Sequence, residues 1–289
     1  MTASSSPSAP GPEPAPHATR AHSFNAAAAQ YAANRPSYPP ALFDAVEELA
    51  GRTLAGAKVA DVGAGTGIST VLLHDRGADV LAVEPGPGMA AEFRRVHPRL
   101  PIVRGSGDAL PLADASMDFL TYAQSWHWTD PDRSVPEALR VLRPGGALAL
   151  WWNTEALDVP WIEAAARRME RFFGIDPVVE KNGSGARAAH SLSADPGGRL
   201  SFDRRRVRWS RRVPLDTHLA NIGSHSAFLV LGEEATAAFF AEEREHLLLT
   251  FPDEIVEETY VVELLVATHS ETRVRRPTPE GRRPDHPPS

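Results

Sequence analysis

The sequence contains no cysteine, and it also lacks any long apolar run. Without cysteine the chain forms neither disulfides nor cysteine-ligated iron–sulfur clusters. No stretch is long enough to cross a membrane, and residues 1–20 lack the basic start and apolar core of a signal peptide. We therefore expect a cytoplasmic protein with no membrane partner, whose 42% hydrophobic residues supply an ordinary core.

Positive charge is also in short supply, with 30 Lys and Arg against 37 Asp and Glu and a formal net charge of −7. This balance gives no general attraction to nucleic acid, and we expect no nucleic-acid partner. The one basic stretch, residues 203–213, alternates apolar Val207 and Trp209 with arginines such as Arg206 and Arg208. That period of two predicts an edge strand guarded by charge, and nucleic-acid contact is the less favoured alternative.

The most informative stretch is residues 59–70, V-A-D-V-G-A-G-T-G-I-S-T, which predicts a buried strand, a glycine turn and then a helix. Gly63, Gly65 and Gly67 allow positive φ and close approach of a ligand to the backbone, while the following helix presents its unpaired N–H groups. A dinucleotide fingerprint needs its third glycine where Ile68 stands. The turn therefore favours a nucleoside site without a pyrophosphate.

The chain divides into a central domain and two tails by composition. Strands and helices alternate through residues 58–153, which predicts a parallel sheet covered on both faces. Residues 174–200 show no clear period and are either a substrate lid or a disordered insertion. The expected units are a disordered tail at 1–22, a domain at 23–268 with a core at 56–153, a variable cap or insertion at 154–202, C-terminal strands and helices at 203–268, and a disordered tail at 269–289.

Further motifs follow the glycine turn in a fixed order. Asp61 precedes the turn as a carboxylate inside an apolar strand, where burial normally requires a partner or a ligand. Glu84 ends the next apolar run, and later motifs lie at residues 101–112, 116–128 and 142–150. In this order they resemble class I S-adenosylmethionine-dependent methyltransferases. The resemblance implies a Rossmann-like, doubly wound α/β sheet of seven strands, the last antiparallel, with a helical cap.

The resemblance also implies S-adenosyl-L-methionine as cofactor and assigns roles to matching residues. Glu84 would accept the ribose hydroxyls, although an acid here also occurs in nicotinamide enzymes. Asp108 would bond the adenine amino group. The residues expected to bind the donor are Tyr38, Asp61, Gly63, Ala64, Gly65, Gly67, Glu84, Pro85, Met89, Gly107, Asp108, Ala109, Gln124 and Ser125.

Residues 34–39, N-R-P-S-Y-P, and residues 124–128, Q-S-W-H-W, look like the small-molecule branch that includes trans-aconitate methyltransferase-like enzymes. Residues 123–126 depart from the N/D-P-P-Y/F motif of amino and nucleobase N-methyltransferases. The absence of cysteine removes radical chemistry and cysteine-dependent pyrimidine methylation. We therefore expect a small organic acceptor, with O-methylation favoured over C-methylation, and no metal, because no acidic cluster is recognisable.

His127 is the candidate catalytic residue, because it follows a strand at the edge where open α/β sheets bind ligands and its ordinary pKa lies near neutral. It acts as a general base or as a hydrogen-bond donor to the substrate, or it is a packed histidine in an aromatic loop. Tyr38 either closes over the donor or covers the sheet. His225, between two serines, is a weaker candidate for the substrate side.

Two other functions stay open at this point. The chain either binds S-adenosylmethionine without catalysis, as a partner in a biosynthetic complex, or it is a nicotinamide oxidoreductase, which Ile68 disfavours. The Pro-rich tails are compatible with a partner role, although such tails are usually solvated linkers.

Overall fold

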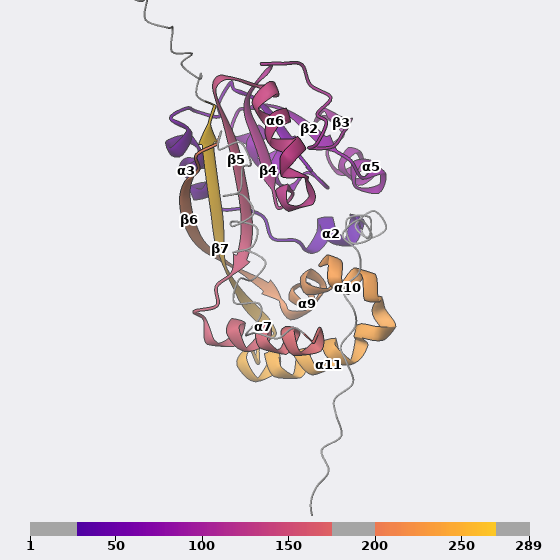
Figure 1. The fold of residues 1–289 in the computed structure, drawn as a ribbon. Helices are drawn as coiled ribbons and strands as arrows, with labels where there is room; N and C mark the ends of the chain where they lie inside the picture. Colours follow the sequence, from indigo (N-terminus) through magenta and orange to yellow (C-terminus); the bar gives the residue numbers. More distant parts are fainter. Residues whose placement is uncertain (1–27, 175–199, 270–289) are drawn as a thin grey trace, which may run out of the picture.

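Seven strands form one mixed sheet at the centre of the computed structural model, which describes residues 28–174 and 200–269 (Figure 1). Their order is β3-β2-β1-β4-β5-β7-β6. Strands β1 to β5 are parallel, and β7 lies antiparallel between β5 and β6. The strands are β1 Lys58–Val62, β2 Asp79–Glu84, β3 Ile102–Arg104, β4 Met117–Ala123, β5 Leu142–Glu155, β6 Asp203–Pro214 and β7 Ile255–Thr268. The predicted seven-stranded fold with its antiparallel last strand is confirmed.

The helices follow local signals in the sequence. Four of them, α3, α5, α6 and α7, begin with proline, whose fixed φ suits the first turn and whose missing N–H is not needed there. The helices are α2 Ala28–Asn34, α3 Pro40–Ala50, α4 Ile68–Asp75, α5 Pro87–Val96, the 3₁₀ turn η1 Trp126–Trp128, α6 Pro131–Val141, α7 Pro160–Phe172, α9 Leu215–Gly223, α10 Ser226–Leu231 and α11 Glu233–Thr250. None in the described ranges is long and apolar enough to span a bilayer.

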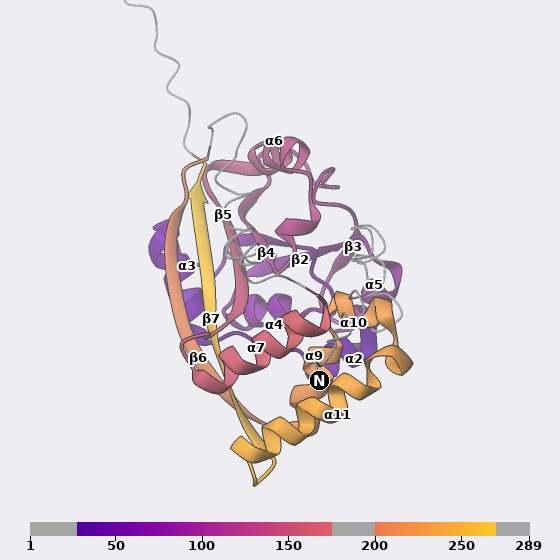
Figure 2. The ribbon, with the colours of Figure 1, turned by 60° about the horizontal axis from the view of Figure 1, so that its bottom comes forward.

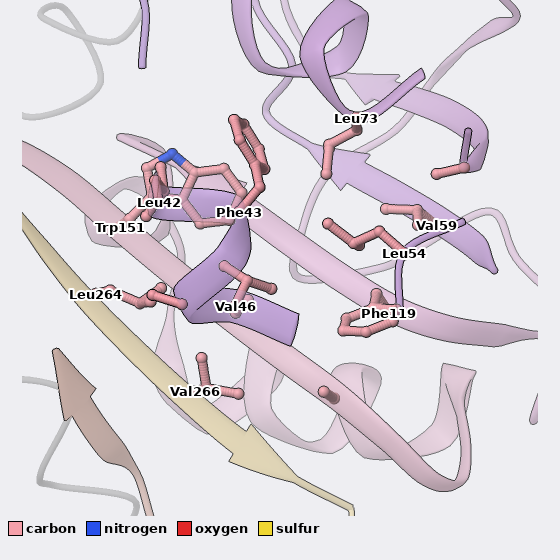
Figure 3. Packing of buried hydrophobic residues seen from close by; sticks show 14 of the residues in the cluster. Leu42, Phe43, Val46, Leu54, Val59, Leu73, Phe119, Trp151, Leu264 and Val266 are labelled. Atoms are coloured by element: carbon pink, nitrogen blue, oxygen red, sulfur yellow. The ribbon is translucent and has the colours of Figure 1, made fainter. Parts of the chain in front are cut away.

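Hydrophobic clusters cover both faces of the sheet, because side chains alternate along each strand. Leu42, Phe43 and Val46 of α3 pack with Phe119 and Trp151 on one face (Figure 3). On the other face, the buried side of α6 packs against β4 and β5. Full burial of each such side chain contributes about 1.5–3 kcal/mol, so the two clusters hold the strand ends in fixed positions.

Helices α7, α9, α10 and α11 form a separate layer beyond the ends of β4 and β5, which we call the cap (Figures 1 and 2). Its centre is a cluster of phenylalanines that includes Phe172, Phe228 and Phe239. The guanidinium of Arg168 on α7 donates two hydrogen bonds to Glu243 on α11, whose side chain is only 1% exposed. The cap therefore has a small core of its own.

The arginine-rich stretch forms β6 at the edge of the sheet, and the predicted alternation of exposed and half-buried residues is confirmed. Arg206 pairs with Glu263 at 2.6 Å and Arg208 pairs with Asp158 at 2.8 Å. The exposed arginines therefore place charge along the edge strand, which opposes its pairing with another chain, and they form ion pairs with acids of the same chain. The predicted tail at 1–22, nearly all of the tail at 269–289 and most of the segment 174–200 lie outside the described residues.

Candidate functional site

The ends of β1, β2 and β4 lie at one edge of the sheet, which we call the carboxyl edge. Register fixes this arrangement, because Val62 pairs with Val83 and Asp61 pairs with Thr121 across parallel strands. The turns that follow these strands therefore meet, and most of the predicted donor-binding residues lie in them. Open α/β sheets bind ligands at this edge.

The glycine turn after β1 has the backbone conformation that its sequence predicts. The φ values of Gly63, Gly65 and Gly67 are +68°, +58° and +96°. A Cβ on Gly63 would lie 2.4 Å from the Cβ of Ser125, whose hydroxyl donates to the carbonyl of Val62 at 2.6 Å. A Cβ on Gly65 would meet no described atom within 4 Å. Gly63 thus serves close packing of two turns, whereas Gly65 borders open space.

Asp61 is fully buried at the end of β1 and has two partners within the protein. The hydroxyl of Thr70 on α4 donates to one carboxylate oxygen at 2.7 Å, and that of Thr121 on β4 donates to the other at 2.9 Å. Burial raises the pKa of Asp61 to about 6, although these hydroxyls oppose the shift. Asp61 therefore links β1 to α4 and to β4. Its contact with the donor stays a prediction.

Glu84 stands at the end of β2 with its carboxylate turned toward the glycine turn. One oxygen accepts the N–H of Gly65 at 2.8 Å, and the other accepts the N–H of Gly86 at 2.6 Å. The residue is only 6% exposed, and burial raises its pKa even though these bonds oppose the shift. Each carboxylate oxygen has two lone pairs, so one lone pair on each remains for a pair of ligand hydroxyls. Nearby, Pro85 is exposed and Met89 is buried on α5.

The loop after β3 brings Gly107, Asp108 and Ala109 against the start of α6. A Cβ on Gly107 would lie 2.8 Å from a methyl carbon of Thr129, so this position requires glycine. One oxygen of the half-exposed Asp108 accepts the N–H of Asp130 at 2.9 Å, and Ala109 is exposed. Asp108, which is predicted to bind the adenine amino group, is thus held in place by a backbone N–H group.

The turn after β4 contains Gln124, a non-glycine residue with a φ of +59°. Its N–H donates to the carbonyl of Trp151 at 2.9 Å, which keeps the left-handed conformation in place. Ala64 and Gln124 are half-buried, and Ser125 is buried. This turn, with two of the residues expected to bind the donor, therefore lies beside the glycine turn.

His127 is exposed in η1, and the indole N–H of Trp152 donates to its Nδ1 at 3.1 Å. When Nδ1 accepts, the neutral ring carries its proton on Nε2. This geometry supports the predicted role as hydrogen-bond donor and disfavours the role as base. Tyr38 is buried in the hydrophobic cluster, with its ring edge-on to Trp151 at 6.0 Å. Tyr38 therefore covers one face of the sheet. Its contact with a donor stays a prediction.

A polar cluster that no sequence motif predicted lies where β6 and β7 meet the cap. Glu258 on β7 is only 2% exposed in its side chain and contacts Arg211 of β6 at 2.5 Å and His218 of α9 at 2.7 Å. His225 lies nearby, and burial, together with the neighbouring Arg35 and His218 side chains, holds its pKa well below its usual value. These residues are far apart in the sequence and form no spaced motif, so only the fold brings them together.

Comparison with known proteins shows what the central part of the chain resembles. Residues 60–150 match the methyltransferase domain family. The matched range contains the glycine turn, Glu84, the loop of Asp108 and the turn of Gln124. This part of the chain is therefore similar to a methyltransferase domain, in agreement with the predicted resemblance.

Individual relatives extend the match. An uncharacterized methyltransferase of Mycobacterium tuberculosis is 44% identical over 159 residues, which are 55% of this chain and 63% of the relative. A demethylmenaquinone methyltransferase of Beutenbergia cavernae is 39% identical over 107 residues, 37% of this chain and 43% of the relative. A candidate type II methyltransferase structure from Anaeromyxobacter dehalogenans has a TM-score of 0.61 and 26% identity, over 82% of this chain and 98% of that one. The chain thus spans less than two thirds of the length of these sequence relatives.

Proposed function

We propose that this chain transfers a methyl group from S-adenosyl-L-methionine to a small organic molecule. The observation that carries the proposal is the carboxylate of Glu84, which is hydrogen-bonded to the glycine turn and keeps lone pairs for two ribose hydroxyls. The match of residues 60–150 to methyltransferase domains supports the same donor. A nicotinamide cofactor is disfavoured by both Ile68 and this match.

In the proposed complex the turns of the carboxyl edge divide the work of holding the donor. Gly65 leaves open space beside the backbone, and Glu84 accepts the ribose hydroxyls. The loop of Asp108 holds the adenine, while Gln124 and Ser125 border the sulfonium. The donor supplies a methyl group that is already activated, so the protein mainly aligns the acceptor and excludes water, which contributes about 7–11 kcal/mol of the barrier.

The acceptor side belongs to the same proposal. The turn after β4 lacks the motif that holds an amino group in nucleobase and glutamine N-methyltransferases. One relative is named a demethylmenaquinone methyltransferase. We therefore place the chain in the small-molecule branch that its residues resemble, that of trans-aconitate methyltransferase-like enzymes, and favour O-methylation over C-methylation.

Isothermal titration with S-adenosylhomocysteine tests the donor site. We expect one molecule bound per chain, and we expect Glu84→Gln to weaken binding about 10- to 100-fold, because hydrogen bonds to a charged group contribute about 1.5–3 kcal/mol. Glu48→Gln on exposed α3 is the matched control and leaves affinity unchanged. Wild-type protein that binds no S-adenosylhomocysteine would contradict the proposal. Binding without transfer to any acceptor would instead favour the catalytically silent partner.

A further inference from the structure

Two buried polar atoms in the cap lack a hydrogen-bond partner among the described residues. They are Nε2 of His218 and Oδ1 of Asn221, whose residues are 8% and 5% exposed. Both residues belong to α9 and are three positions apart, which places them on the same side of the helix. Buried polar groups in folded proteins almost always have a partner, so this pair indicates a place for a ligand.

The protonation of this cluster shows what kind of ligand fits. Although burial opposes it, hydrogen bonds from His218 and Arg211 hold the pKa of Glu258 below its usual value, so Glu258 is a carboxylate. A carboxylate only accepts, and Nδ1 of His218 must therefore donate to it at 2.7 Å. In its neutral form the ring then presents a lone pair on Nε2.

Asn221 is oriented by the same logic. Its amide nitrogen faces the Glu258 carboxylate at 3.5 Å and donates to the Tyr260 hydroxyl at 3.1 Å. The carbonyl oxygen is left as the unpartnered atom. With His218 neutral, the two unpartnered atoms, Nε2 of His218 and Oδ1 of Asn221, are therefore both hydrogen-bond acceptors. They fit a molecule that brings hydroxyl groups, and they do not fit a carboxylate.

A continuous set of contacts connects this cluster with the carboxyl edge. The N–H of Gln124 donates to the Trp151 carbonyl, and the ring of Tyr38 packs on Trp151. The end of α2 then reaches the cluster, because Arg211 of β6 donates to the Asn34 carbonyl at 3.1 Å. Helix α2 contacts both α5, beside the donor turns, and α9 (Figure 1). The cluster thus lies on the cap side of the carboxyl edge.

We propose that His218, held by Glu258, is the base that takes the proton of the acceptor, and that the acceptor is an alcohol or phenol whose hydroxyl donates to Nε2 of His218. The carbonyl of Asn221 orients a second donor group of the same molecule. This inference rests on the proposed function and names its substrate class. His127, whose Nε2 carries a proton, remains a hydrogen-bond donor.

The proton and the electrons balance in one step. The acceptor oxygen uses a lone pair to form the O–CH₃ bond, and its proton passes to Nε2 of His218. S-adenosylmethionine, when bound, supplies the methyl group as its S–CH₃ bond breaks and the electron pair stays on sulfur. The resulting imidazolium is stabilised by the Glu258 carboxylate, which Arg211 keeps in place. Water returns the histidine to its neutral form after product release.

Charged groups from several neighbouring elements act on His218 and on the residues around it. Carboxylates favour the imidazolium, and the cations oppose it. The charged and titratable groups are Glu258 on β7, Glu155 on β5, Arg211 on β6, Arg35 after α2, and His225 before α10.

The test compares two phenols in the full-length protein with labelled S-adenosylmethionine. At about pH 8, 4-nitrophenol is mostly an anion, whereas only about 1% of 4-methylphenol, with a pKa of about 10, is ionised. We expect His218→Asn, which keeps a donor toward Glu258, to lower methylation of 4-methylphenol about 10- to 100-fold, because that ionised fraction needs no base and sets the limit of the loss. Methylation of 4-nitrophenolate stays within a few-fold of wild type, because no proton has to be removed.

Two controls separate this role from a structural one. His246→Asn on α11 removes another histidine that faces a glutamate, at 3.5 Å, and leaves both rates unchanged. Titration with S-adenosylhomocysteine gives the same affinity in both variants as in wild type. An equal loss with the two phenols, or transfer to neither by wild-type protein that binds S-adenosylhomocysteine, overturns the inference. Failure of wild type to bind S-adenosylhomocysteine overturns the proposed function, and the inference with it.

Discussion

The carboxyl edge and the cap lie at the same end of the sheet (Figure 1), but they are built in different ways. At the edge, backbone groups and short turns do most of the positioning, as when Gly65 and Gly86 donate their N–H groups to Glu84. In the cap, the positioning is done by side chains from distant segments, such as Arg211, His218 and Glu258. A site formed by backbone groups keeps its geometry when side chains are replaced, whereas a site formed by side chains changes with single substitutions. We therefore expect donor recognition to be fixed and acceptor choice to be adjustable.

The largest effect is expected from Gly63→Ala at the edge. The new Cβ would lie 2.4 Å from that of Ser125 in a left-handed conformation. Strain of about 1–2 kcal/mol and overpacking of about 1–3 kcal/mol together lower the free energy of unfolding. Urea denaturation measures it, and Gly56→Ala, with a φ of +74° and no described atom within 4 Å, is the control for strain alone. An equal loss of unfolding free energy in the two variants would show that the glycine turn and the turn of Ser125 are not closely packed.

The cap counterpart is Glu258→Ala, which leaves Arg211 and His218 without their carboxylate. We expect the free energy of unfolding to fall by about 3 kcal/mol, the low end for a broken buried pair, because Arg211 stays 22% exposed. Affinity for S-adenosylhomocysteine, measured by titration, stays at the wild-type value. Glu257→Ala, at the exposed neighbouring position, changes stability by less than about 0.5 kcal/mol. A loss of donor affinity would show that the two regions are not separable.

A pH effect of similar or smaller size belongs to Asp61. Its pKa rises from 3.8 to about 6 on folding, so the folded chain binds this proton more tightly than the unfolded chain. The stability linked to this group is thus complete below about pH 4 and declines as pH rises through about 6, by roughly 3 kcal/mol in all. Urea denaturation of wild type and Asp61→Asn between these pH values should show the decline in wild type alone. Parallel curves would contradict the shift.

The smallest effect is expected on the edge strand, where Arg206→Ala removes an exposed pair with Glu263. Such pairs contribute about 0.2–1 kcal/mol, and 1 M salt should reduce the difference further because it screens exposed charges. Chemical denaturation at low and high salt checks this. A larger loss would mean that the arginines of β6 do more than guard an edge.

Local patterns predicted the strands and turns of the edge, because each motif there is complete within a dozen residues. Single glycines decide two helix boundaries. Helix α4 begins only at Ile68, since Gly67 is left-handed, and Gly232 separates the short helix α10 from α11. The His218–Glu258 pair spans 40 residues and depends on tertiary packing, so no spacing could reveal it.

The position of β7 has a consequence for how the chain is made. Although β6 is synthesised earlier, it reaches the sheet only through β7, which pairs with β5 on its other side. A nascent chain can therefore assemble β1 to β5 as it leaves the ribosome, but β6 must wait, unpaired, for the last strand. Its exposed arginines then have a second use, because like charges keep waiting β6 segments of neighbouring nascent chains apart.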